Sequence, residues 1–124
     1  MIGVLTHHWA NKEQVNQARE LLDRNGLAQS KAPGFISRQT FISLADETKI
    51  TTLVTWENNE IYDAWRASPE RAAVMSGARV LWSRPTESER FEVVGRIVSR
   101  DTHAPAWIIN LILSRYLTEI FGEK

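Results

Sequence analysis

The chain has 124 residues with 15 basic and 15 acidic side chains, so its formal net charge at pH 7 is zero. This length suits one domain with a hydrophobic core and is too short for two, and the balanced charge disfavours nucleic acid and anionic lipid as partners. The absence of cysteine excludes disulfides, thiolate metal sites and a cysteine nucleophile. We therefore expect a single domain in a reducing compartment, the cytoplasm.

Residues 2–9 predict a first β-strand. The N-terminal sequence lacks the basic segment before an apolar run that marks a signal peptide, so none is expected. Side chains alternate along a strand, so one face carries Ile2, Val4, Thr6 and His8, and the other carries Gly3, Leu5, His7 and Trp9.

A helix is predicted to follow this strand, with Asn11 as its N-cap. Its apolar residues recur at helical spacing, at Val15, Ala18, Leu21 and Leu22. Gly26 suits the left-handed position just after a helix end, where Leu27 would then contact Leu22. We expect the helix to end there and to be followed by a connector that closes on the turn signal Ala32-Pro33-Gly34.

Two antiparallel strands are predicted next, the first over residues 35–44, joined to the second by the polar turn 45–48. In the second strand, the side chains that share one face are Ile50, Thr52, Val54 and Trp56. This alternation is typical of a half-buried strand.

The period of the sequence changes from two to about 3.6 between residues 53 and 70. Ile61, Ala64 and Trp65 form one face of a helix that Asn58 or Asn59 caps. Ser68-Pro69-Glu70 combines an N-cap residue, a proline at the first helical position and an acid in the first turn, which together predict a second helix. We expect a helix that is broken at Ser68 and ends near Gly77.

A polar loop over residues 85–90 and a fourth strand over 91–99 complete the predicted elements. The order of strands and helices predicts an α+β fold of the ferredoxin-like, split βαβ type with a four-stranded antiparallel sheet. Helices cover only one face of such a sheet, so we expect a second copy to cover the other face in a homodimer. The strand residues expected to need that cover are Ile50, Val54, Val93 and Ile97.

Residues 53–70 contain, in this order, the end of a strand, the sequence TWE, a short polar turn, AW and SPE. This succession resembles the antibiotic biosynthesis monooxygenase (ABM) domain. The resemblance covers about residues 2–99 and implies a dimeric α/β barrel. It also implies that Trp65, at the AW position, lines a pocket between helix and sheet and packs on a flat aromatic substrate. Core packing is the alternative role for Trp65, and Trp56 on the sheet can fill the core or the dimer barrel.

A haem-degrading branch of this family carries an axial histidine about three turns beyond that tryptophan and an asparagine on the first strand. This chain has Val74 and Met75 at the first place and no asparagine on residues 2–9. A lone methionine on a helix is usually a packing residue. We therefore expect no haem, no other cofactor and no metal.

His7 and His8 are adjacent on the first strand, so they point to opposite faces and at most one can serve a pocket. A pocket histidine can act as a general base that removes a phenolic proton; a hydrogen-bonded structural histidine is the alternative. We predict catalytic roles for His7, His8 and Trp65. The residues predicted to line the substrate pocket are Trp9, Arg38, Trp56, Val74 and Met75.

Cofactor and nucleophile motifs are missing from the sequence. The glycines are scattered, so no phosphate-binding loop is expected, and no GxSxG motif is present. We predict a cofactor-independent monooxygenase that acts on an aromatic or quinol-like small molecule, in which the substrate supplies the electrons. The alternatives are a haem-binding or haem-degrading protein and a non-catalytic dimer that binds a hydrophobic small molecule.

Residues 101–124 differ from the rest because they are rich in large apolar side chains between Trp107 and Phe121. Asn110, Ser114 and Thr118 interrupt the apolar run, so a membrane span is not expected. We predict an apolar helix that packs on the domain formed by residues 1–100 or on the dimer mate. An interfacial membrane helix is the alternative.

Overall fold

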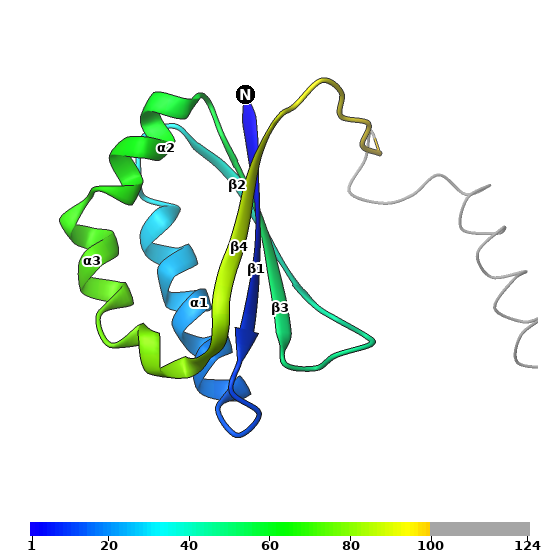
Figure 1. Ribbon diagram of the computed structural model, residues 1–124. Coiled ribbons are helices and arrows are strands. Elements are labelled where there is room, and N and C mark those ends of the chain that lie inside the picture. The colour runs from blue at the N-terminus through cyan, green and yellow to red at the C-terminus, as the bar shows by residue number, and fades with distance from the viewer. Residues whose placement is uncertain (100–124) are drawn as a thin grey trace, which may run out of the picture. The chain divides into compact units, whose positions relative to one another are not determined.

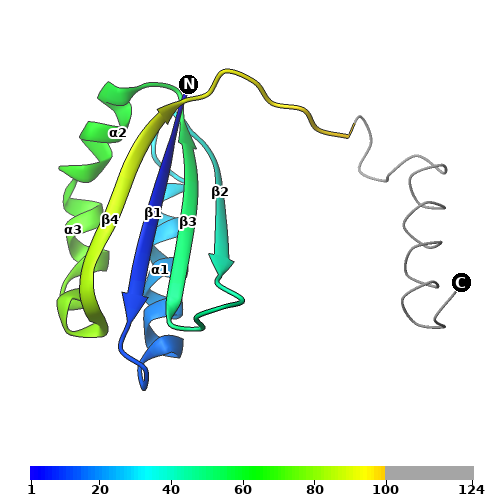
Figure 2. The same cartoon turned by 45° about the vertical axis from the view of Figure 1, so that its right-hand side comes forward.

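A computed structural model describes residues 1–99 (Figure 1). The elements in chain order are β1 (Ile2–Ala10), α1 (Val15–Gln29), β2 (Phe35–Ile42), β3 (Lys49–Trp56), α2 (Asn59–Arg66), α3 (Pro69–Met75), a 3₁₀ turn η1 (Ala78–Leu81) and β4 (Trp82–Glu92). The strands form one antiparallel sheet in the order β2-β3-β1-β4. Figures 1 and 2 show α1, α2 and α3 together on one side of this sheet. The predicted ferredoxin-like α+β fold is therefore confirmed.

The break between α2 and α3 forms where the sequence predicts it. Asn58 caps α2 through its side-chain oxygen, which accepts a hydrogen bond from the Ile61 amide at 2.9 Å. Ser68 caps α3 in the same way, with the Arg71 amide 3.2 Å from its hydroxyl, and Pro69 occupies the first turn. Gly77 has a left-handed backbone with φ of 77° and follows the end of α3. Local capping chemistry sets these boundaries.

The predicted ends of the first helix are wrong. Helix α1 runs through Gly26 to Gln29. Gly26 does not end the helix; it leaves room for the Arg38 side chain, which crosses the helix there. A Cβ atom at Gly26 would lie 2.6 Å from Nε of Arg38. At the other end, Gln14 precedes the helix, and the side-chain Nδ2 of Asn11 donates to the carbonyl of Val80 at 2.8 Å instead of Asn11 capping the helix.

The fourth strand also differs from its prediction. It covers Trp82–Glu92 and pairs with β1, so the segment predicted as a polar loop is part of the sheet. Residues 94–99 form no helix or strand, and Ile97 is fully exposed. Strand β4 is an edge strand with polar side chains on both faces, so it has no apolar alternation that the sequence pattern can detect.

The hydrophobic core lies between the sheet and its helices. Its two clusters contain Ile2, Val4, Val54, Trp56 and Trp65, and Ala10, Ala18, Leu22 and Ile50. Ile50 and Val54 are thus buried by this chain's own helices, which corrects the expectation that they need a second copy for cover.

The opposite side of the sheet is called the open face here. The strand register places Leu5, His7, Trp9, Phe41, Leu53 and Phe91 on it. Phe41 and Phe91 are each 45% exposed. Apolar area that needs cover is therefore present, but on the face opposite to Ile50 and Val54.

Residues Met1–Val93 form one compact unit. The predicted apolar helix between Trp107 and Phe121, and its packing, lie outside the described residues. Within residues 1–99, no helix has the length and the apolar composition needed to cross a membrane.

Candidate functional site

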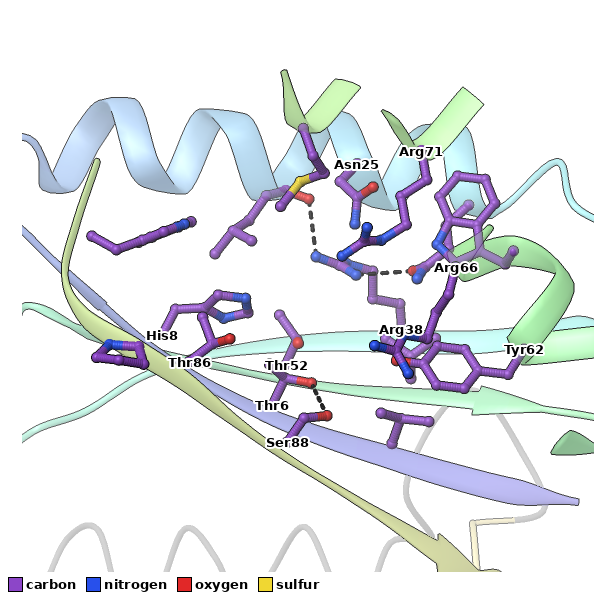
Figure 3. Close-up of a pocket in the computed structure, with 18 of the residues that line it drawn as sticks. Thr6, His8, Asn25, Arg38, Thr52, Tyr62, Arg66, Arg71, Thr86 and Ser88 are labelled. Atoms are coloured by element: carbon purple, nitrogen blue, oxygen red, sulfur yellow. Dashed lines mark hydrogen bonds between the residues drawn. The ribbon is translucent and has the colours of Figure 1, made fainter. Parts of the chain in front are cut away.

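A cavity of about 930 Å³ lies between the helices and the inner face of the sheet (Figure 3). Side chains from all four strands, all three helices and η1 line it. Small-molecule sites in proteins typically occupy about 300–1,000 Å³. The cavity therefore has the size for a ligand of a few fused rings.

Three successive rows of the inner face, set by the register of the sheet, contribute residues to the cavity. The first row runs across all four strands and contains Arg38, Val54, Val4 and Arg90. The second row contains hydroxyl side chains, namely Thr40, Thr52, Thr6 and Ser88, and the Thr6 and Ser88 hydroxyls lie 3.0 Å apart. The third row contains Ile42, Ile50 and His8.

The first and third rows are separated by four residues along β1, from Val4 to His8. At about 3.3 Å per residue this separation is about 13 Å at the level of the backbone. Guanidinium groups and the imidazole therefore enter the cavity from different parts of the sheet. Figure 3 shows the same division, with Arg38, Arg66 and Arg71 away from His8.

His8 is the histidine of the pair that lines the cavity. Its side chain is 7% exposed, and its ring lies 5.1 Å from that of Trp82. The pKa of His8 is lowered to about 4, mainly by burial; the charges of Arg38 and His7 also lower it, and a hydrogen bond with the Ile50 backbone opposes the shift. The imidazole is therefore neutral at pH 7 and is able to accept a proton.

The hydrogen-bonding capacity of His8 is not fully used. Its Nδ1 atom is buried and has no hydrogen-bond partner within residues 1–99. His7, by contrast, lies on the open face, where its Nδ1 atom is 2.8 Å from the Thr51 hydroxyl. The structure thus places only one of the two predicted histidines at the cavity.

Trp65 both packs in the core and lines the cavity. It is 5% exposed, and its ring stacks on Trp56 with centroids 6.3 Å apart and planes 29° apart. Trp56 lies beneath it, has no exposed surface and is not among the cavity-lining residues. The two roles weighed for Trp65 are compatible, because one part of the ring is covered and another faces the cavity.

Of the remaining residues predicted to line the pocket, some line the cavity and others do not. Met75 lines the cavity and Val74 does not. Trp9 lies on the open face, with the Arg84 guanidinium 3.8 Å above its ring. Trp9, Trp56 and Val74 are therefore not part of this cavity, whereas Arg38 and Met75 are.

Arg38 crosses from β2 to α1 over Gly26. Its guanidinium donates to the Leu22 carbonyl and to the side-chain oxygen of Gln29, each at 2.9 Å. Burial lowers the pKa of Arg38, and the charge of Asp23 opposes that shift. The guanidinium is thus held in a fixed position, with its remaining donors available to the cavity.

Several cavity residues were missed by the sequence analysis. They are Asn25, Tyr62, Arg66, Arg71, Arg79 and Arg90. Tyr62 and Arg66 are four residues apart on α2, on the face shared with Trp65, and helical spacing is a signal that could have found them. Arg90 could not be found because its strand was not predicted.

Within residues 1–99, no group of three or more histidine, aspartate or glutamate side chains is placed to hold a metal ion.

Comparison with known proteins agrees with this architecture. Residues 1–76 match the family described as antibiotic biosynthesis monooxygenase. No curated protein has a matching sequence.

Solved structures with the same fold include three from different organisms. SnoaB, a cofactor-independent oxygenase from Streptomyces nogalater, is 11% identical, with a TM-score of 0.69 over 77% of this chain and 95% of that chain. Rv0793 from Mycobacterium tuberculosis is 15% identical, with a TM-score of 0.70 over 78% of this chain and 98% of the other. A conserved protein from Methanosarcina mazei is 18% identical, with a TM-score of 0.68 over 73% and 89%.

Proposed function

The chain belongs to the antibiotic biosynthesis monooxygenase family, and from that premise we propose that it oxidises an electron-rich phenol or quinol in the cavity beside His8, without an organic or metal cofactor. The placement of His8 is the observation that supports this most directly. A neutral imidazole with cavity space beside it has a lone pair that can accept the proton of a bound phenol. The negative charge of the resulting phenolate would raise the pKa of His8 from the value of about 4 that it has in the free chain. The fold shared with SnoaB, an oxygenase of this class, supports the same reaction type.

The reaction begins when the phenolic proton moves to His8, which leaves an electron-rich phenolate. The phenolate passes one electron to dioxygen, and the two radicals combine at the ring carbon para to the oxygen. The O–O bond of the resulting peroxide then breaks. One oxygen atom stays on the carbon as a quinone carbonyl, and the other leaves as water with the two hydrogens of the former C–H and O–H bonds. The substrate thus supplies all four electrons.

The walls of the cavity suit a flat substrate. Trp65 and Tyr62 line it from α2, and Trp82 lines it next to His8. Aromatic rings offer large apolar faces on which a fused-ring substrate can stack. In this proposal Trp65 holds the plane of the substrate and His8 contacts its hydroxyl.

The assembly we propose is a homodimer in which a second copy covers the open face. Its exposed aromatic residues, Phe41 and Phe91, belong to one side of a four-stranded sheet that no described helix covers. Exposed aromatic side chains on an uncovered sheet face favour an interaction site there.

Anthrone, whose enol form is a tricyclic phenol, provides the test. The full chain should consume one dioxygen per anthrone and form anthraquinone and water, at a rate proportional to protein concentration and above the spontaneous reaction. With ¹⁸O₂, mass spectrometry should find one labelled oxygen in each anthraquinone. If anthrone quenches the tryptophan fluorescence but oxygen uptake stays at the spontaneous rate, the protein is a binding module and not an oxygenase.

A further inference from the structure

The cavity has a charge that the chain as a whole does not have. Six arginines line it, namely Arg38, Arg66, Arg71, Arg79, Arg84 and Arg90, and no aspartate or glutamate within residues 1–99 does. The formal net charge of the chain is nevertheless zero. Positive charge is therefore concentrated at one site.

Two of these arginines are already neutralised. Arg90 forms an ion pair with Asp63 at 2.6 Å. Arg84 stacks on Trp9 of the open face and pairs with Glu87 at 3.2 Å. The other four form no ion pair with any carboxylate in the described part of the chain.

Arg38 is the most constrained of these four. Its two hydrogen bonds, to Leu22 and Gln29, are to neutral oxygens. Asp23 is near enough to act on its charge, but no carboxylate of the described residues forms a direct ion pair with it. A buried charge is costly unless an opposite charge accompanies it. An anion in the cavity would relieve that cost and would complete the hydrogen bonding of the guanidinium fork.

Four of the six arginines, Arg38, Arg66, Arg71 and Arg90, occupy one end of the cavity, whereas Arg84 pairs with Trp9 beside His8. Arg38 and Arg90 mark the two edges of the first row of the sheet, and His8 belongs to the third row. In Figure 3, Arg66 and Arg71 lie at the same end as Arg38, where α1 contributes Asn25. That end of the cavity thus presents three cations, Arg38, Arg66 and Arg71, that form no ion pair with a carboxylate of the described residues.

We propose that the substrate is an aromatic acid, whose carboxylate is held by Arg38 and Arg71 while its phenolic ring extends toward His8. This rests on the proposed function only in taking the cavity as the substrate site. A planar carboxylate matches the geometry of a guanidinium and can accept two hydrogen bonds from it. Binding at the arginine end would orient the ring and leave its hydroxyl at the neutral imidazole.

A matched pair of probes tests the inference without any oxygen chemistry. 6-Hydroxy-2-naphthoic acid carries a carboxylate and a hydroxyl at opposite ends of two fused rings, and 2-naphthol lacks the carboxylate. By isothermal titration calorimetry with the full chain at pH 7 and low salt, the acid should bind at least about tenfold more tightly than 2-naphthol. Added salt should weaken the binding of the acid and leave that of 2-naphthol unchanged.

Three variants assign the effect to its residues. Arg71→Gln and Arg38→Gln should reduce the preference for the acid to within about threefold, whereas Arg24→Gln, on the exposed side of α1, should keep it. Arg71 makes no side-chain hydrogen bond to residues 1–99, so its variant should fold normally even if Arg38→Gln does not, and circular dichroism will check both.

The inference is overturned if 2-naphthol binds as tightly as the acid, if Arg71→Gln keeps the full preference, or if Arg24→Gln loses it equally. An arginine-dependent preference without oxygen uptake from any phenol would leave the inference standing and remove the proposed function. Oxygen uptake from anthrone with no preference for the acid would overturn the inference and leave the proposed function standing.

Discussion

The two faces of the sheet carry similar residues in different surroundings. On the inner face, His8 is buried beside Trp82 and lines a cavity. On the open face, its neighbour His7 lies 6.1 Å from the ring of Trp9 and is hydrogen-bonded to Thr51. The chemistry available to each imidazole follows from its surroundings, because only the inner one is both buried and next to a ligand-sized space.

This difference shows what the helices contribute to the site. They bury one face of the sheet, supply Trp65 and Tyr62, and exclude water from His8. The open face keeps its residues available for contact with another protein surface. We therefore assign chemistry to the inner face and assembly to the open face.

Acidification should affect the inner histidine more than the outer one. The pKa of His8 is about 4 in the folded chain and about 6.5 when unfolded, so the unfolded state binds more protons between these values. The stabilisation is fully present above pH 6.5 and is lost as the pH falls toward 4, by up to about 3 kcal/mol. Urea unfolding across this range should show the loss.

The same measurement on two variants sharpens the contrast. His8→Gln removes the titrating group and should flatten the pH dependence of the free energy of unfolding between pH 6.5 and 4. His7→Gln should retain most of the wild-type slope. Equal slopes in the two variants would mean that His8 is not the buried, neutral group of this pair.

Association should depend on the open face. Leu53 lies at its centre, paired with Leu5 on β1, and a second copy would bring two introduced charges close together. Leu53→Glu should therefore weaken the dimer at least about tenfold, or about 1.4 kcal/mol, in sedimentation experiments in which the wild type sediments at twice 14.2 kDa. The matched control is Leu27→Glu on α1, which is 68% exposed and should leave the dimer intact. A monomeric wild type would remove the assignment of the open face to assembly.

Short-range chemistry made much of the fold predictable from the sequence. Asn58 and Ser68 cap their helices through hydrogen bonds to residues three positions away, and Gly77 follows the end of α3 with a left-handed backbone. The helix end predicted at Gly26 was wrong, because a glycine is needed there for close packing with Arg38, which is distant in the sequence. Strand β4 was missed because it is defined by its pairing with β1 and not by an apolar pattern of its own.

The site was less predictable than the fold for a related reason. Alternation along β1 shows that His7 and His8 point to opposite faces, but the local sequence does not say which face the helices cover. The arginines of the cavity come from β2, α2, α3, η1 and β4. Their convergence depends on the tertiary fold, and none of them belongs to a short motif.

The central claim is that the inner face performs the chemistry, and oxygen uptake with anthrone by two variants tests it most directly. His8→Gln keeps the approximate size of the side chain but cannot accept the phenolic proton, so its rate should fall about 100-fold. His7→Gln alters the adjacent residue on the other face and should retain the wild-type rate. A His8→Gln protein that turns over at the wild-type rate, or a His7→Gln protein that loses as much, would contradict the account.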